Sequence, residues 1–167
     1  MGTGKSEDSG IGFVRHDHRL CIARGLAEVD GICAAEGLRL TAIRRRVLEI
    51  LLESHKALGA YDVLARLSNE GRKPQPPAAY RALEFLMQNG FAHKIERLNA
   101  YVACAHPHQV HDPAFMICRC CHGVAEAQAA PARGVLGQTA KSIGFRIERT
   151  SVEALGICPD CQQGRTP

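Results

Sequence analysis

Two C-x-x-C pairs near the end of the chain constrain its fold more than any other feature. They are Cys118-Arg-Cys-Cys121 and Cys158-Pro-Asp-Cys161. Each pair offers two thiolates from one tight turn, and two such turns complete the tetrahedral site of a structural zinc ion. Cys120 could replace Cys121, but a two-residue spacer favours Cys118 with Cys121. A thioredoxin-like redox motif is a weaker reading, because we expect neither pair to open a helix after a parallel strand.

Whether the cysteines bind metal or form disulfides depends on the cellular compartment. The N-terminus, MGTGKSEDSG, lacks the apolar core of a signal peptide, so we expect a cytoplasmic protein. In that reducing compartment, eight Cys and eight His point to metal ligation rather than disulfides. No apolar run approaches the ~18 residues of a membrane helix, so no membrane contact is expected. The net charge of +4 is mild, so any nucleic-acid contact should be local.

Apolar periodicity predicts an α+β chain with two folded domains. Helices are expected from about residue 19 to 37, after Thr41 to about 53, over 60–69, and from Pro76 to Asn89-Gly90. After Gly90, apolar residues recur at every second position, which predicts a hairpin of strands 91–97 and 100–104 around Leu98-Asn99. Helices followed by a hairpin are typical of a winged helix-turn-helix DNA-binding domain. The predicted boundaries are an arm 1–18, this domain 19–104, a hinge 105–112, a second α/β domain 113–162 and a tail 163–167.

The second domain contains both cysteine pairs. We expect strands at 113–118, 123–127 and 144–155 and a helix at 131–142. The remaining cysteines need no metal role: Cys21 and Cys33 fit the apolar side of the first helix, and Cys120 stays unassigned.

A second metal site is predicted at the hairpin. If the turn is Leu98-Asn99, His93 faces Cys104, and opposed residues place their Cβ atoms ~5 Å apart. Glu126 and the histidines of the hinge, His106, His108 and His111, are the available further donors. A Cys ligand among His and Glu favours zinc over ferrous iron or manganese. Such a site would join the two domains, which suits a regulatory metal better than a structural one.

The DNA-reading candidates lie on the fourth predicted helix and near the second. Tyr80 and Arg81 stand in the first turns of the fourth helix, opposite its apolar face, where side chains suit groove reading and phosphate contact. A local basic patch is expected from Arg39, Arg44, Arg45 and Arg46.

Enzyme motifs are lacking. There is no H-E-x-x-H, and His93-Lys-Ile-Glu96 has the wrong spacing for the H-x-E of a zinc deaminase. We therefore expect neither catalysis nor a small-molecule substrate.

With these motifs, the chain resembles the ferric-uptake-regulator family of metal-dependent repressors, and most closely its zinc-uptake-regulator branch. The resemblance covers roughly residues 20–162, although Ala78-Ala79 replaces the usual Thr-Val before the Tyr-Arg pair. The matching segments are Arg39-Leu-Thr41 with Arg44, Ala60-Tyr61-Asp62, Pro77–Leu86, Phe91-Ala-His93-Lys94, Tyr101-Val-Ala-Cys104, Phe115-Met-Ile-Cys118, Cys121 and Gly156-Ile-Cys158-Pro-Asp-Cys161.

The resemblance implies a homodimeric repressor that uses zinc as corepressor, binds palindromic operator DNA and silences zinc-uptake genes. The second domain would be its dimerisation domain, and two zinc ions per subunit are expected. The implied structural ligands are Cys118, Cys121, Cys158 and Cys161, the implied sensing ligands are His93, Cys104, His111 and Glu126, and the expected DNA contacts are Tyr80, Arg81, Arg44 and Arg39. One alternative is an iron- or peroxide-sensing repressor of the same family, whose sensing site would contain only N and O ligands. Another is a zinc–thiolate redox switch built on Cys120 and the cysteine pairs.

Overall fold

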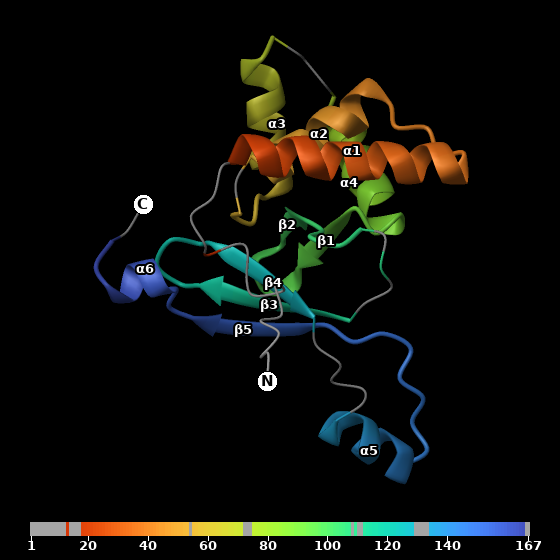
Figure 1. Ribbon diagram of the computed structural model, residues 1–167, viewed down its shortest axis with the longest axis vertical. Coiled ribbons are helices and arrows are strands. Elements are labelled where there is room, and N and C mark those ends of the chain that lie inside the picture. Colours follow the sequence, from red (N-terminus) through yellow and green to blue (C-terminus); the bar gives the residue numbers. More distant parts are fainter. Residues whose placement is uncertain are drawn as a thin grey trace, which may run out of the picture. The chain divides into compact units, whose positions relative to one another are not determined.

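The computed structural model describes residues 13, 18–53, 55–71, 75–107, 109, 112–128 and 134–165 (Figure 1). These residues form two compact units, one within 15–109 and the other within 110–167 together with Phe13. The predicted arm, 1–18, lies outside the described residues except for Phe13 and His18. The predicted domain boundaries stay predictions.

Helices build most of the first unit, as the periodicity predicts. They are α1 (His18–Glu36), α2 (Ala42–Leu52), α3 (Ala60–Asn69) and α4 (Pro76–Gln88). Thr41 occupies the N-cap position of α2, but its hydroxyl makes no capping hydrogen bond. At α3, the Asp62 carboxylate accepts a hydrogen bond of 2.9 Å from the N–H of Gly59. Two prolines open α4, where a missing N–H costs nothing because first-turn donors have no helical partner.

The core of the first unit forms where α2 packs against α1, α3 and α4. The hydrophobic effect explains this arrangement, because each helix buries one apolar stripe there. The most fully buried large side chains of this core are Val47, Leu48, Ile50 and Leu51 of α2, Val63 and Leu67 of α3, Leu83 and Leu86 of α4, and Phe91.

A hairpin of β1 (Ala92–Ile95) and β2 (Ala100–Ala103) follows the helices. The predicted register is wrong by two residues: Ile95 pairs with Ala100, and His93 pairs with Val102 rather than with Cys104. The cause is the loop, which contains a 3₁₀ turn over Glu96–Leu98 and a left-handed Asn99 with φ of 46°. This loop is longer than the expected two-residue turn.

The hairpin is joined to the segment before α3. Leu58 donates a hydrogen bond of 2.9 Å to the Tyr101 carbonyl, and Tyr101 donates one of 2.8 Å in return. Helices followed by this small sheet make the first unit a winged helix, as the sequence predicts.

The second unit is built on a three-stranded sheet in the order β4–β3–β5. The central β3 (Pro113–Cys118) pairs antiparallel with β4 (Val124–Gln128) and parallel with β5 (Val152–Gly156). Because β3 and β5 run in the same direction, their carboxyl ends lie at one edge, where Cys118 is in register with Gly156. The unit also contains α5 (Val135–Ser142) and the short α6 (Pro159–Gln162).

The predicted strand 144–155 is wrong over its first half. Residues 145–151 form no strand, and β5 begins at Val152. Phe145 and Ile147 alternate as in a strand, but in the described part of the chain no strand pairs with them. Gly144, with φ of 71°, instead ends α5, and the Phe145 N–H donates to the Ala140 carbonyl at 2.8 Å. Of the predicted helix 131–142, residues 131–133 lie outside the described part.

No helix within the described ranges has the length and apolar character that crossing a membrane requires.

Replacing Leu67 by Ala tests the packing of the first unit. Leu67 has no exposed surface, so the truncation leaves a cavity and should lower the free energy of unfolding by about 2–5 kcal/mol. Leu20→Ala is the matched control, because Leu20 is 64% exposed and should change stability by less than about 0.5 kcal/mol. Urea denaturation followed by circular dichroism measures both, and equal losses for the two variants would contradict the packing described.

Candidate metal centres and nucleic-acid interface

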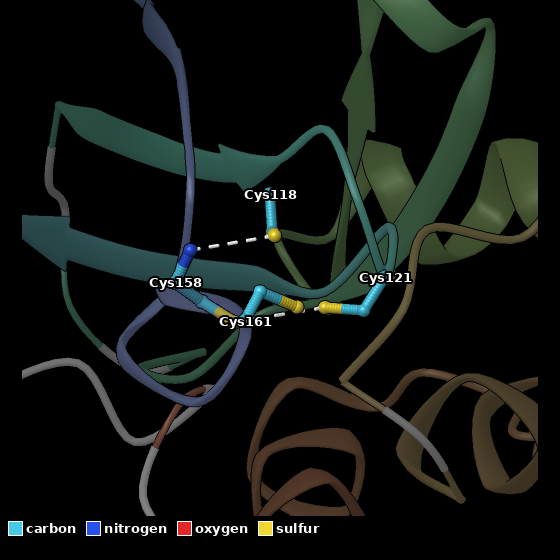
Figure 2. Close-up of side chains that lie close together, drawn as sticks. All are labelled: Cys118, Cys121, Cys158 and Cys161. Carbon is cyan, nitrogen blue, oxygen red and sulfur yellow. Dashed lines mark hydrogen bonds between the residues drawn. The ribbon is translucent and has the colours of Figure 1, made fainter. Parts of the chain in front are cut away.

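Four cysteine thiols converge at the edge of the three-stranded sheet (Figure 2). The Sγ atoms of Cys118, Cys121, Cys158 and Cys161 all lie within 4.8 Å of one another, and those of Cys121 and Cys158 are 3.8 Å apart. A tetrahedral zinc ion with Zn–S bonds of about 2.3 Å has sulfur–sulfur edges of about 3.8 Å. The donor set and its spacing therefore fit zinc.

The strands and turns of the second unit explain this convergence. The first cysteine turn follows β3, and the second follows the parallel β5, so both leave the same edge of the sheet. In the first turn, His122 adopts a left-handed φ of 59° and donates a hydrogen bond of 3.0 Å to the Cys118 carbonyl. Gly123 follows at a position where a Cβ atom would lie 3.3 Å from the Cys121 Sγ. The backbone is therefore folded tightly around that sulfur.

The expectation that neither cysteine pair opens a helix is wrong. Cys158 occupies the N-cap position of α6, directly after the parallel strand β5. This local arrangement alone would suit a dithiol redox motif. The two thiols of the other pair lie within the same cluster, however, and four convergent thiols match a closed metal site better than a disulfide.

Hydrogen bonds prepare one of these thiols for metal binding. Burial alone would raise the pKa of Cys118, but backbone N–H groups of Cys121, Cys158 and Cys120 stabilise the thiolate and lower this pKa to about 6. The Cys158 N–H donates to the Cys118 Sγ at 3.3 Å. Desolvation raises the pKa values of Cys121 and Cys161 above their ordinary value. Zinc would have to displace the protons from these two thiols.

The other cysteines stand outside this cluster. Cys120 is exposed, and Cys121 provides the fourth thiol. Cys33 is buried in the helical core, as expected, and Cys21 is partly buried on α1.

His93 and Cys104 meet on the hairpin of the first unit. Both are buried, and a ring nitrogen of His93 lies within 4.8 Å of the Cys104 Sγ. The corrected register explains why they still meet. Cys104 lies two residues beyond Val102, the residue paired with His93, so both side chains point to the same face. A hydrogen bond of 3.0 Å from the Cys104 N–H to the Phe91 carbonyl fixes the backbone there.

The other predicted sensing ligands belong to different parts of the chain. Glu126 lies on β4 and is partly buried. His111 and its alternative His108 lie outside the described residues, whereas His106 is described and partly buried. Within the first unit, the structure thus brings together two of the four predicted ligands.

Two of the four predicted DNA contacts, Tyr80 and Arg81, lie on the exposed face of α4. Tyr80 is 43% exposed, and Arg81 is also exposed, whereas Ala79 and Leu83 on the same helix are buried. Arg39 is exposed as well. Arg44 lies close to α4: its guanidinium carbon is 3.7 Å from the centre of the Phe85 ring, and Nη1 donates to the Arg39 carbonyl at 2.7 Å. This cation–π contact holds the start of α2 against α4.

Arg45 and Arg46, which the sequence predicts to be part of a basic patch, are both paired with carboxylates of the protein. Arg45 makes an ion pair with Asp30 of α1. Arg46 pairs with Glu49, Glu53 and Glu70. The i, i+3 spacing of Arg46 and Glu49 could have indicated one of these pairs. Asp30 and Glu70 are far away in the sequence, so only the fold brings them to the arginines.

The fold and the four-thiol cluster define a winged-helix protein with a separate metal-binding unit. The model of the ferric uptake regulator family matches residues 35–155. The chain is 36% identical over 137 residues to the zinc uptake regulation protein of Escherichia coli, covering 81% of this chain and 80% of that protein. The chain therefore belongs to the ferric uptake regulator family.

Solved structures of zinc regulators share the fold. A zinc uptake regulator complexed with zinc and DNA matches with a TM-score of 0.80 and 35% identity, over 86% of this chain and 96% of that chain. A crystal structure of holo XcZur matches with a TM-score of 0.72 and 38% identity, over 83% of this chain and 96% of that chain.

The affinity of the four-cysteine site for zinc should rise steeply with pH. Above pH 6 the Cys118 thiol is already largely ionised, but Cys121 and Cys161, whose pKa values are raised, must still lose their protons. Each proton released corresponds to about a tenfold gain in affinity per pH unit, so these two thiols alone should give at least about a hundredfold gain. Competition with a chromophoric chelator between about pH 6.5 and pH 8 measures this slope. Cys120→Ser should leave it unchanged, and an affinity independent of pH would contradict the assigned ligands.

Proposed function

We propose that the chain is a zinc-responsive transcriptional repressor, which binds a palindromic operator as a zinc-loaded homodimer and represses zinc-uptake genes. Zinc at Cys118, Cys121, Cys158 and Cys161 would be structural. Zinc at His93, Cys104, His111 and Glu126 would be the signal. The protein would not be an enzyme, and it would act in the cytoplasm, where its operator DNA is.

The observation that carries this proposal is the meeting of His93 and Cys104 on the wing. A buried imidazole and a buried thiol with ligand atoms within 4.8 Å can share one ion. The sulfur donor favours zinc over ferrous iron or manganese, which argues against an iron- or peroxide-sensing repressor. The similarity to a zinc uptake regulator complexed with zinc supports the same metal.

The two remaining ligands would make this zinc a signal. His111 and Glu126 follow the wing in the sequence, so one ion bound by all four residues would link the winged helix to the second unit. Zinc would then stabilise the conformation in which the two recognition helices of a dimer match the operator spacing. Without zinc, binding would be weakened by the small population of that conformation.

Operator recognition would depend on α4. Tyr80 and Arg81 are exposed on this helix while its opposite face is packed in the core. Arg81 offers the bidentate donors that suit guanine or phosphate, and Arg39 lies exposed just before α2. The similarity to a regulator solved with DNA supports this use of the winged helix.

The homodimer is supported by apolar surface on the second unit. Several large apolar side chains there are at least half exposed in a single chain, which is costly in water and typical of an interface. They are Val135, Leu136, Ile143, Phe145 and Leu155. A second copy of the chain would cover them, and paired subunits would suit a palindromic operator.

Replacing Cys104 by Ser tests the sensing site. The hydroxyl is a much poorer zinc ligand than the thiolate, so operator binding should require a free zinc concentration at least about tenfold higher. Fluorescence anisotropy in zinc buffers measures this, with a duplex selected from a random library by the zinc-loaded wild-type protein. Cys33→Ser, which alters a buried cysteine of the helical core, is the matched control and should keep the wild-type zinc dependence. Wild-type zinc dependence of Cys104→Ser itself would rule out the assigned ligand.

Replacing Arg81 by Ala tests the DNA-reading face. The loss of one direct contact should weaken binding to the selected duplex by about 1–3 kcal/mol. If Arg81 contacts a phosphate, the slope of log affinity against log salt also falls by about one. Arg165→Ala, which removes another exposed arginine, in the second unit, should change neither quantity. Equal behaviour of the two variants would contradict the assignment of α4 as the recognition helix.

A further inference from the structure

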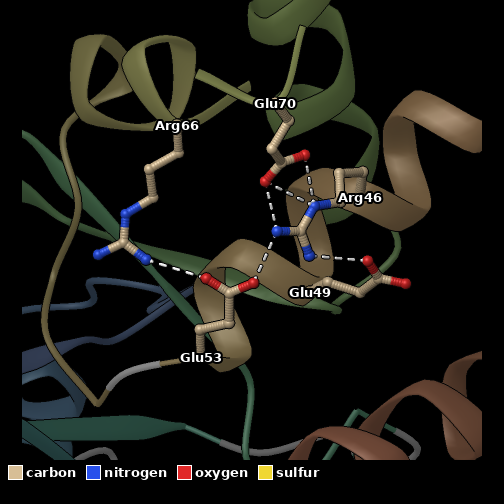
Figure 3. Close-up of polar contacts among 5 residues, drawn as sticks. All are labelled: Arg46, Glu49, Glu53, Arg66 and Glu70. Atoms are coloured by element: carbon tan, nitrogen blue, oxygen red, sulfur yellow. Dashed lines mark hydrogen bonds and ion pairs between the residues drawn. The ribbon is translucent and has the colours of Figure 1, made fainter. Parts of the chain in front are cut away.

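Arg46 stands at the centre of an ion-pair cluster that connects α2 with the end of α3 (Figure 3). Its Nε lies 3.0 and 2.9 Å from the two carboxylate oxygens of Glu70, and its Nη2 lies 2.5 Å from one of them. Its Nη1 donates to Glu49 at 2.9 Å, and Nη2 lies 2.8 Å from Glu53. Arg66 completes the cluster by binding the other oxygen of Glu53 at 3.2 Å.

The positions of these residues connect two helices of the first unit, α2 and α3. Arg46 and Glu49 lie within α2, and Glu53 is its C-cap. Arg66 lies in the last turn of α3, and Glu70 is the C-cap of α3. Gly71 follows with φ of 76°, and α4 begins at Pro76. The cluster therefore fixes the point from which the chain turns from α3 into α4.

This geometry makes the cluster stronger than ordinary surface ion pairs. The side chain of Arg46 is 23% exposed, and those of Glu49, Glu53 and Glu70 are 25%, 34% and 32% exposed. Partial burial reduces screening by salt, and the forked contact with Glu70 fixes direction as well as charge. Without Arg46, the cluster would hold the three carboxylates just named and a single cation, Arg66.

The same contacts argue against Arg46 as a phosphate ligand. Its Nε, Nη1 and Nη2 atoms all bind carboxylates of the protein. Hydrogen bonds with Glu70, more than any other interaction, raise the pKa of Arg46 above its ordinary value, so these contacts stabilise its positive charge. A phosphate could take up these donors only after the cluster had been broken.

We propose that Arg46 is a positioning residue for operator recognition, which orients α4 by holding the end of α3 against α2 and does not itself touch DNA. This inference rests on the proposed function, because it assumes that α4 reads the operator. It differs from the sequence prediction, in which Arg46 belongs to the DNA-binding patch.

The test uses full-length, zinc-saturated protein and the selected duplex, at a temperature at which circular dichroism shows every variant to be folded. Arg46→Met should weaken binding by about 3- to 30-fold, with an unchanged slope of log affinity against log salt. Arg146→Met is the matched control. It removes the same charge from an exposed arginine of the second unit and should leave affinity unchanged.

Glu70→Gln is the second variant, and it decides the test if Arg46→Met does not fold. It removes a negative charge, so simple attraction to DNA would predict tighter binding. If Arg46 orients α4 through Glu70, the Glu70→Gln variant should instead bind DNA more weakly, because the forked contact with Arg46 is lost. The double variant should bind no more weakly than Arg46→Met alone, because both changes break the same connection.

Three results would overturn the proposal while wild-type protein still binds the duplex in a zinc-dependent manner. They are unchanged affinity in folded Arg46→Met, a salt slope that falls by about one in that variant, and tighter binding by Glu70→Gln. If the wild-type protein selects no duplex with zinc present, the proposed function itself fails, and this result is distinguishable from the other three.

Discussion

The parallel pairing of β3 with β5 is the constraint on which the metal-binding unit depends. It brings two cysteine turns, distant in the sequence, to one edge of a small sheet, where Cys118 is in register with Gly156. The apolar core beneath them is slight, with Phe115 and Ile117 as its largest fully buried side chains. A unit of this size gains much of its stability from a bound structural metal, because binding free energy is then folding free energy. Zinc and strand pairing would thus stabilise each other.

In the first unit, the arrangement depends on α2, which packs against α1, α3 and α4. Its apolar face fills the core, and its run of three arginines makes three different internal contacts: Arg44 with Phe85 of α4, Arg45 with Asp30 of α1, and Arg46 with the end of α3. A run of like charges, typical of a DNA-binding surface, here makes contacts with three neighbouring helices. The exposed face of α4, with Tyr80 and Arg81, is the surface that we propose for recognition, and the hairpin brings His93 and Cys104 together.

The sequence predicts those features that depend on local chemistry. The limits of α3 follow from its apolar spacing and from Gly71, and the four cysteines that cluster in the structure follow from their spacing alone. It fails where the outcome depends on distant partners. The alternation of Phe145 and Ile147 is that of a strand, but pairing needs a neighbour that the described part of one chain does not supply. The predicted hairpin register is wrong for a local reason, the left-handed Asn99 in the loop, whereas the ion pairing of Arg46 depends on the distant Glu70.

The proposed function requires two zinc sites of different character in each chain, one structural and one regulatory. The most direct measurement is native mass spectrometry of the protein before and after a mild chelator, with operator binding followed in parallel. We expect two zinc ions per chain, one of which is lost together with DNA binding while the fold persists. A single zinc ion per chain, or DNA binding that survives loss of the exchangeable ion, would contradict the proposed function.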